Sequence, residues 1–246
     1  DIWETDKILK EEVGDPQTQV FAIGPAGEKL VAMAIPVCNL TRAVGGCGTG
    51  AVMGSKKLKA IAVWGTKAVN IADLDGFKKA CEEAYEKIEK HPLYEEFSTY
   101  GTPGLVGVLQ ERGGLPTHNF QQSEFPSWED VDGYTFARNY SMKSKACFAC
   151  PVHCSHFYAV RTGPYTGIHG EGPEYETIDG FGPKCGISNM AFILYANNLC
   201  NRLGLCTIQT SNAICTSMHL SQDNIIDVAD TDGLVLMWGN EDDAIK

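Results

Sequence analysis

Hydrophobic positions in the first 70 residues fall mostly into short runs separated by glycine-rich turns, a pattern typical of β-strands. Residues 4–14 differ, because their apolar positions have the spacing of a short amphipathic helix that ends at Gly14. A turn is predicted at residues 24–27. Strands are predicted at residues 18–23, 30–35 and 61–69. We therefore expect residues 1–70 to be the end of a β-rich domain.

Helical spacing dominates after residue 70. Residues 72–97 predict a helix that Asp73 or Asp75 could cap and that Pro92 would end. Its apolar face is formed by Phe77, Cys81, Tyr85 and Ile88. Further helices are predicted at residues 103–112, 187–204 and 206–220. The expected fold class is α+β, with a boundary near residue 70 and a mostly α-helical domain over residues 71–246.

Composition and charge exclude several classes of protein. With 43% hydrophobic residues, the 246-residue chain can bury a core and does not resemble a disordered protein. The net charge of −11 argues against nucleic acid or an anionic membrane surface as a partner. No apolar run approaches the roughly 20 residues of a membrane-spanning helix, and the first residues lack a signal-peptide pattern. We expect a cytoplasmic protein.

The ten cysteines have no regular paired spacing, and a chain of this length does not need disulfides to fold. Metal binding together with scattered buried thiols in a reducing, oxygen-poor compartment fits better. Three of the cysteines, Cys147, Cys150 and Cys154, have the spacing C-x₂-C-x₃-C, which lets one loop wrap an iron–sulfur cluster or a zinc ion. His153 or His156 would complete a zinc site, whereas a cluster needs a fourth cysteine. The spacing leaves both open.

Two glycine-containing stretches bring backbone or carboxylates into reach of a ligand. Five glycines between Arg42 and Lys56 would let backbone N–H groups approach a phosphate or a cofactor edge, although the run matches neither a dinucleotide nor a Walker A loop. A structural turn cluster explains the same run. Residues 170–176 carry three carboxylates, which would supply a general base if one lies near a metal and otherwise form a solvated loop.

A third stretch closes the helix predicted at residues 187–204. Gly204 fits the left-handed position after the last helical turn, and Cys206 directly beyond it is either a ligand or a small buried hydrophobe.

Together these stretches resemble the aldehyde:ferredoxin oxidoreductase family of tungsten–bispyranopterin enzymes. The resemblance covers the whole chain and lies in motifs that occur in the order of the family. They are IGPAGE at 23–28, GAVMGSKKLKAI within 42–61, ACFACPVHC at 146–154, GEGPEYE at 170–176, NRLGLC at 201–206 and WGNED at 238–242.

The resemblance implies two cofactors: a tungsten or molybdenum bispyranopterin, with magnesium bridging its phosphates, and a [4Fe–4S] cluster. Cys147, Cys150 and Cys154 would ligate the cluster. The fourth cysteine and a catalytic histidine would lie outside this chain, which would be an internal portion of a longer protein. Arg42 would face the pterin, and the Ala43 carbonyl would help to hold magnesium.

The NRLGLC stretch matches the D-x-x-G-L-D/C pterin-binding motif of the family, so Asn201, Gly204, Leu205 and Cys206 are expected to bind the cofactor. Asn201 replaces the usual aspartate and contributes no charge. Glu176 matches a glutamate beside the metal and would act as general base in the oxidation of an aldehyde with water to the carboxylic acid. Electrons would leave through the cluster to ferredoxin or to an iron–sulfur subunit of a homo- or hetero-oligomer. His118 could also point into the site.

Two alternative functions remain. One is another low-potential reaction in the same family, such as reductive dearomatisation of an aryl-CoA thioester, for which the departures at Asn201 and Cys206 leave room. The other is a zinc-stabilised binding module without redox chemistry. Such a module would be colourless and would have no use for the glycine run.

Overall fold

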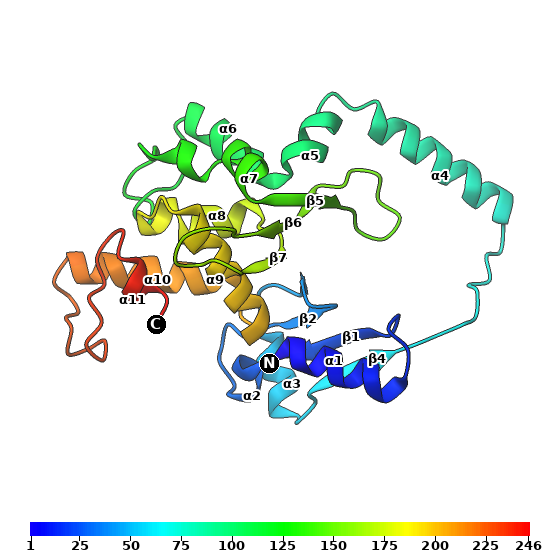
Figure 1. The fold of residues 1–246 in the computed structure, drawn as a ribbon, viewed down its shortest axis with the longest axis horizontal. Helices are drawn as coiled ribbons and strands as arrows, with labels where there is room; N and C mark the ends of the chain where they lie inside the picture. Colours follow the sequence, from blue (N-terminus) through cyan, green and yellow to red (C-terminus); the bar gives the residue numbers. More distant parts are fainter.

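The computed structural model of residues 1–246 combines α-helices with two small antiparallel sheets, which confirms the mixed α+β class (Figure 1). The first sheet has the strand order β3-β2-β1-β4 and pairs Phe21 with Cys38 on one side and with Ile61 on the other. The elements of this β-rich segment are α1 (Ile2–Val13), β1 (Gln19–Ile23), α2 (Pro25–Glu28), β2 (Pro36–Cys38), β3 (Arg42–Ala43), α3 (Thr49–Ser55) and β4 (Ala60–Val63).

A capping box at Asp1 and a glycine at position 14 set the two ends of helix α1. The Asp1 side chain accepts the backbone N–H of Glu4, whose own side chain returns to Asp1 in a capping box. Gly14 closes the helix in the left-handed conformation, with φ of 79°, as the sequence predicted.

The strand predicted at residues 30–35 is wrong. Leu30 has φ of 59°, which ends any extended run, and the strand begins only at Pro36. Ala34 and Ile35 instead pair with residues 204 and 205, since the Ile35 N–H donates to the Gly204 carbonyl at 2.8 Å. The turn predicted at residues 24–27 is a short helix, because Pro25 at its first position favours helical φ.

The remainder of the chain is mainly helical and contains a second sheet that the sequence did not predict. Strands β5 (Ser141–Lys145), β6 (Ser155–Ala159) and β7 (His169–Glu171) form an antiparallel meander. They are short and rich in polar residues, so their hydrophobic pattern is weak. The helices are α4 (Leu74–Glu89), α5 (Tyr94–Tyr100), α6 (Leu105–Glu111), α7 (Gly133–Asn139), α8 (Tyr175–Phe181), α9 (Met190–Leu203), α10 (Thr207–Gln222) and α11 (Glu241–Ala244).

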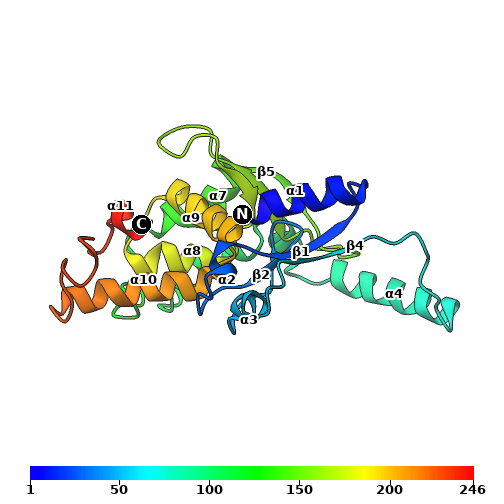
Figure 2. The same ribbon diagram turned by 90° about the horizontal axis from the view of Figure 1, so that it is seen from below.

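Helix α4 stands apart from the rest of the chain in both ribbon views (Figures 1 and 2). Asp73 caps it and it ends at Glu89, before Pro92, as predicted. None of its residues is buried, so the apolar face that contains Phe77 remains open. Its Tyr85 hydroxyl donates to the Ala149 carbonyl at 2.9 Å, which links α4 to the loop between β5 and β6.

The main hydrophobic core lies outside the β-rich segment and contains 22 buried residues. Helix α9 runs through it and contributes three consecutive fully buried residues, Phe192, Ile193 and Leu194. Beneath it, the Tyr158 hydroxyl of β6 donates to the Leu194 carbonyl at 2.9 Å. This core supplies a rigid base for the ends of α8 and α9. No helix is both long and apolar enough to cross a lipid bilayer.

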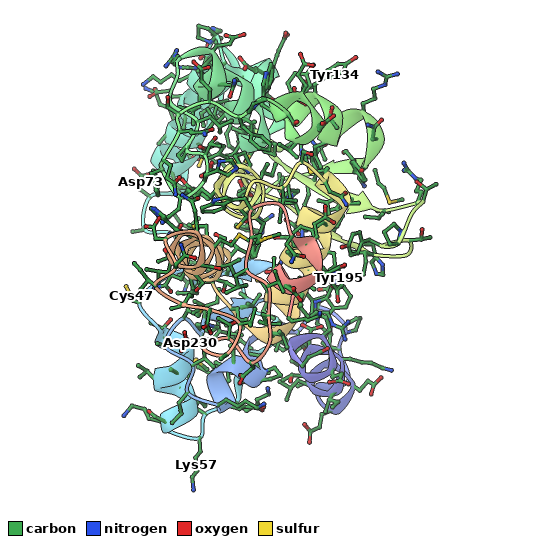
Figure 3. The ribbon with its side chains drawn as sticks, turned by 90° about the vertical axis from the view of Figure 1, so that its left-hand side faces the viewer. Cys47, Lys57, Asp73, Tyr134, Tyr195 and Asp230 are labelled. Carbon is green, nitrogen blue, oxygen red and sulfur yellow. The ribbon has the colours of Figure 1, made fainter.

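The end of α9 reaches down onto the β-rich segment (Figure 1). Figure 3 shows that segment, with Lys57 labelled, at one end of the molecule and α7, with Tyr134 labelled, at the other. Arg202 binds the Asp1 carboxylate at 2.6 Å, and the Cys206 N–H donates to the Met33 carbonyl at 3.1 Å. The candidate site forms along this junction. The boundary near residue 70 stays a prediction.

Candidate functional site

A cavity of about 300 Å³ lies where the β-rich segment meets the core helices, at the lower end of the range for ligand pockets. Its walls come from parts of the chain that are far apart in the sequence, from Ile35 to Ile208. Six of the residues predicted from sequence line it: Arg42, Ala43, Glu176, Asn201, Leu205 and Cys206. Gly204, between two of them, is buried at the turn beneath.

The glycine run forms one wall and divides into two parts. The backbone N–H groups of residues 45–48 donate to no acceptor within the protein. Gly45 lines the cavity, and a Cβ there would meet nothing within 4 Å. A Cβ at Gly48, in contrast, would lie 2.5 Å from the Ala32 carbonyl oxygen. Gly48 therefore allows close packing against Ala32, whereas Gly45 places a free N–H donor beside the cavity.

The turn between α9 and α10 forms the opposite wall. Gly204 has φ of 75° and its N–H donates to the Cys200 carbonyl at 2.9 Å, so the helix ends there and the next residues turn towards the cavity. The Cys206 thiol is buried and α10 begins directly after it. The Thr177 hydroxyl donates to the Thr207 hydroxyl at 3.0 Å, which holds α8 against this turn.

Glu176 lies in the first turn of α8 with its side chain in the cavity wall. Thr102 fixes the start of that helix, because its hydroxyl donates to the Glu174 carboxylate at 2.5 Å and accepts the Tyr175 N–H at 2.9 Å. The Glu176 side chain makes no hydrogen bond or ion pair with the protein. An exposed carboxylate on an anchored helix turn can accept a proton from a bound molecule.

Glu171 is the buried carboxylate of the site, with 2% of its side chain exposed. It accepts hydrogen bonds from the Thr41 hydroxyl at 2.8 Å, the Ser155 hydroxyl at 3.0 Å and the Lys145 ammonium at 2.6 Å, and it pairs with Arg42. Burial raises the pKa of Glu171, but the bonds from Lys145 and Thr41 and the charge of Arg42 outweigh it and lower the pKa below its usual value. We call this group of five residues the Glu171 clamp.

The three clustered cysteines lie on the loop between β5 and β6. The Cys150 N–H donates to the Cys147 carbonyl at 3.1 Å, and Ala149 and His153 have φ of 54° and 59°, so the loop turns sharply twice. Burial, the Glu174 charge and the two neighbouring thiols raise the pKa of Cys154. All three thiols are free, although no three metal-binding side chains of the chain converge closely enough to hold an ion.

Neither His118 nor His156 lines the cavity. His156 is buried against the Phe136 ring at 5.8 Å, and burial lowers its pKa. His118 packs on Trp238 at 4.9 Å and does not line the cavity.

Sequence reasoning missed the residues that join the two halves of the site. Glu171 belongs to the acidic stretch at 170–176, but nothing in that pattern separates a buried carboxylate from two exposed ones. Thr41, Lys145 and Ser155 come from three other segments, and no local signal indicates that they meet.

Two family models match the chain. The model described as "Aldehyde ferredoxin oxidoreductase, N-terminal domain" matches residues 1–65, and the one described as "Aldehyde ferredoxin oxidoreductase, domains 2 & 3" matches residues 79–246. Together they account for almost the whole sequence.

Curated relatives agree. The chain is 41% identical over 231 residues to the tungsten-containing aldehyde ferredoxin oxidoreductase of Pyrococcus abyssi, which covers 94% of this chain and 37% of that protein. It is 39% identical over 239 residues to the corresponding protein of Pyrococcus furiosus, covering 96% and 39%. The aliphatic sulfonate oxidoreductase, WOR-like subunit, of Pyrococcus furiosus is 32% identical over 241 residues, covering 96% and 38%. The chain thus spans less than two fifths of the length of these relatives.

One solved structure shares the fold. The active-site complex BamBC of benzoyl coenzyme A reductase, in complex with 1,5-dienoyl-CoA, superimposes with a TM-score of 0.76 at 22% identity. The match covers 98% of this chain and 37% of that chain. At this identity the likeness concerns the arrangement of helices and strands.

Proposed function

The chain belongs to the aldehyde ferredoxin oxidoreductase family, and on that basis we propose that it forms part of a tungsten enzyme that oxidises an aldehyde with water to the carboxylic acid. One observation carries the proposal: residues from three separate motifs, Arg42, Glu176 and Cys206, line a single cavity. Motifs that only stabilised local turns would not be expected to line one common cavity.

The groups on the two walls of the cavity are of the kind that would hold an anionic cofactor. Arg42, the Ala43 carbonyl and the free N–H groups of residues 45–48 would hold the phosphate-bearing parts of a tungsten bispyranopterin and its bridging magnesium. Asn201, from the last turn of α9, and Leu205 and Cys206, which follow the turn at Gly204, would contact the pterin from the other side. When bound, this cofactor accepts the two electrons of the oxidation.

The cysteine loop would supply the route for electrons. Cys147, Cys150 and Cys154 are free thiols on one sharply turned loop, the donor set that iron–sulfur clusters use. We propose that they ligate a [4Fe–4S] cluster with a fourth cysteine from outside residues 1–246. The natural acceptor would be ferredoxin or an iron–sulfur subunit.

Glu176 would perform the proton chemistry. In R-CHO + H₂O → R-COOH + 2e⁻ + 2H⁺, the attacking water must lose a proton as it adds to the carbonyl carbon. The Glu176 carboxylate faces the cavity and is free of internal partners, so it can accept that proton. Thr102 keeps the first turn of α8 in place while Glu176 does so.

A second candidate is the reduction of an aryl-CoA thioester, for which Asn201, a cavity residue that replaces the aspartate of the family motif, leaves room. Turnover of an aryl-CoA thioester in place of short aldehydes by the purified protein would select this alternative.

The full-length protein, purified without oxygen, is expected to contain about one tungsten and four irons per subunit. Plasma mass spectrometry measures both metals, and a dye-linked assay with a series of aldehydes measures the oxidation. A colourless protein that contains only zinc would contradict the proposal and select a zinc-stabilised module.

Replacing Cys150 with alanine in the full-length protein is expected to remove most of the iron and the dye-linked activity, because the cluster loses one of its ligands. Cys81→Ala is the matched control, since Cys81 lies partly exposed on α4 and has no proposed role. Iron analysis distinguishes the two variants. Equal iron content in both would show that the loop does not hold the cluster.

A further inference from the structure

The Glu171 clamp joins the two sides of the proposed site through a single buried carboxylate. Thr41 and Arg42 come from the β-rich segment, where Arg42 lines the cavity. Lys145 and Ser155 stand at the two ends of the cysteine loop, directly at the end of β5 and the start of β6. One side chain therefore fixes the cavity wall to both ends of the loop.

The backbone around the clamp is equally constrained. Lys145 is paired with Cys154 in an isolated β-bridge, so a shift of Lys145 moves a cysteine of the loop. The Glu171 carbonyl accepts the Asn197 side-chain amide at 3.1 Å, which anchors β7 to the core helix α9. The carboxylate thus belongs to an anchored strand, and its bonds fix the positions of Arg42 and of both ends of the loop.

The charges of the clamp do not cancel. Arg42 and Lys145 carry two positive charges against the single negative charge of Glu171, so the clamp has a net charge of about +1. Both cations keep about a third of their side chains exposed, whereas Glu171 is buried, so the charge of Glu171 is compensated by these protein partners and not by water.

We propose that Glu171 is a positioning residue that sets both the register between Arg42 and the cysteine loop and the charge felt by a cluster held on that loop. The proposal rests on the proposed function, since it assigns this charge to the electron route. The reduction potential of a bound iron–sulfur cluster depends on the net charge and hydrogen bonding around it. The clamp sets part of that charge through residues that do not ligate the cluster.

Charge variants of the full-length holoenzyme test the electrostatic part. Glu171→Gln leaves two cations unneutralised and is expected to raise the midpoint potential of the cluster. Lys145→Gln removes one cation and is expected to lower it. The double variant restores the original net charge and is expected to return towards the wild-type potential. Redox titration followed by electron paramagnetic resonance measures all three, with Glu28→Gln, a surface pair with Lys59, as control.

If the substitutions act only by damaging the loop, the midpoint potentials of both single variants should shift in the same direction, and that of the double variant should shift the most. That pattern, or three unchanged potentials, overturns the proposal. If Glu171→Gln fails to fold, Lys145→Gln still decides, because its side chain is partly exposed and its replacement leaves the carboxylate paired with Arg42.

Hydrogen exchange tests the positioning part without any cofactor. In metal-free full-length protein, Glu171→Gln is expected to speed amide exchange in residues 41–45 and 145–155 together, and Glu28→Gln in neither. Faster exchange in one segment alone overturns the joint role. A wild-type protein that holds no cluster overturns the proposed function instead, and the exchange result then decides the clamp by itself.

Discussion

Replacing Glu176 with glutamine is expected to lower the rate of aldehyde oxidation by roughly 10²–10⁴-fold, the usual contribution of a general base. The amide keeps the size of the side chain but cannot take a proton from water. The Glu176 side chain makes no hydrogen bond or ion pair within the chain, so its replacement should leave α8 and the cavity intact. Tungsten and iron contents measured on the same preparation should equal those of the wild type.

Glu95→Gln is the matched control for this experiment. Glu95 occupies the second position of α5, a helix of seven residues that also begins with Tyr-Glu, so it reproduces the loss of a carboxylate from the first turn. It does not line the cavity. Equal activity of Glu176→Gln and Glu95→Gln would show that Glu176 is not the general base. Loss of tungsten in Glu176→Gln would mean that the residue holds the cofactor.

Elements with strong local signals were predictable from the sequence. Helix α1 between its Asp1 cap and Gly14, and helix α9 up to Gly204, follow from spacing and from their terminal residues. The second sheet was not predictable, because β5 is Ser-Met-Lys-Ser-Lys, whose side chains are mostly exposed and carry almost no hydrophobic pattern. The strand expected at residues 30–35 failed because Leu30 has φ of 59° and the following residues turn, so that only Ala34 forms a bridge, to Leu205.

The residues of the site differ in the same way, because some have a local signal in the sequence and others do not. Arg42, Glu176 and Cys206 could be found because each belongs to a motif that can be recognised within a few neighbouring residues. Glu171 could not, since its role depends on Lys145 and Arg42, which approach only once both sheets are folded. A glycine count likewise does not reveal that Gly24 and Gly204 touch each other.

Replacing Gly204 with alanine is expected to open the junction that carries the cavity. A Cβ at this position would lie 2.8 Å from the Gly24 backbone nitrogen and 3.0 Å from the Ile35 carbonyl oxygen, atoms that cannot move aside as a side chain would. Overpacking of this kind costs roughly 1–3 kcal/mol. Alanine at φ of 75° adds roughly 1–2 kcal/mol of backbone strain. The Ile35 and Cys206 amides, which bond across the junction, should therefore lose protection from hydrogen exchange by roughly 30-fold or more.

Gly14→Ala separates strain from contact. Gly14 also ends a helix in the left-handed conformation, with φ of 79°, but a Cβ there would meet nothing within 4 Å. It should lose protection only near α1, by an amount that backbone strain alone explains. Gly24→Ala tests the contact from the other side, because its Cβ would lie 2.1 Å from the Leu203 carbonyl oxygen while its φ of −90° suits alanine. If Gly24→Ala and Gly204→Ala both leave the Ile35 and Cys206 amides protected, the two backbones do not meet as described, and the cavity loses the contact that holds its walls together.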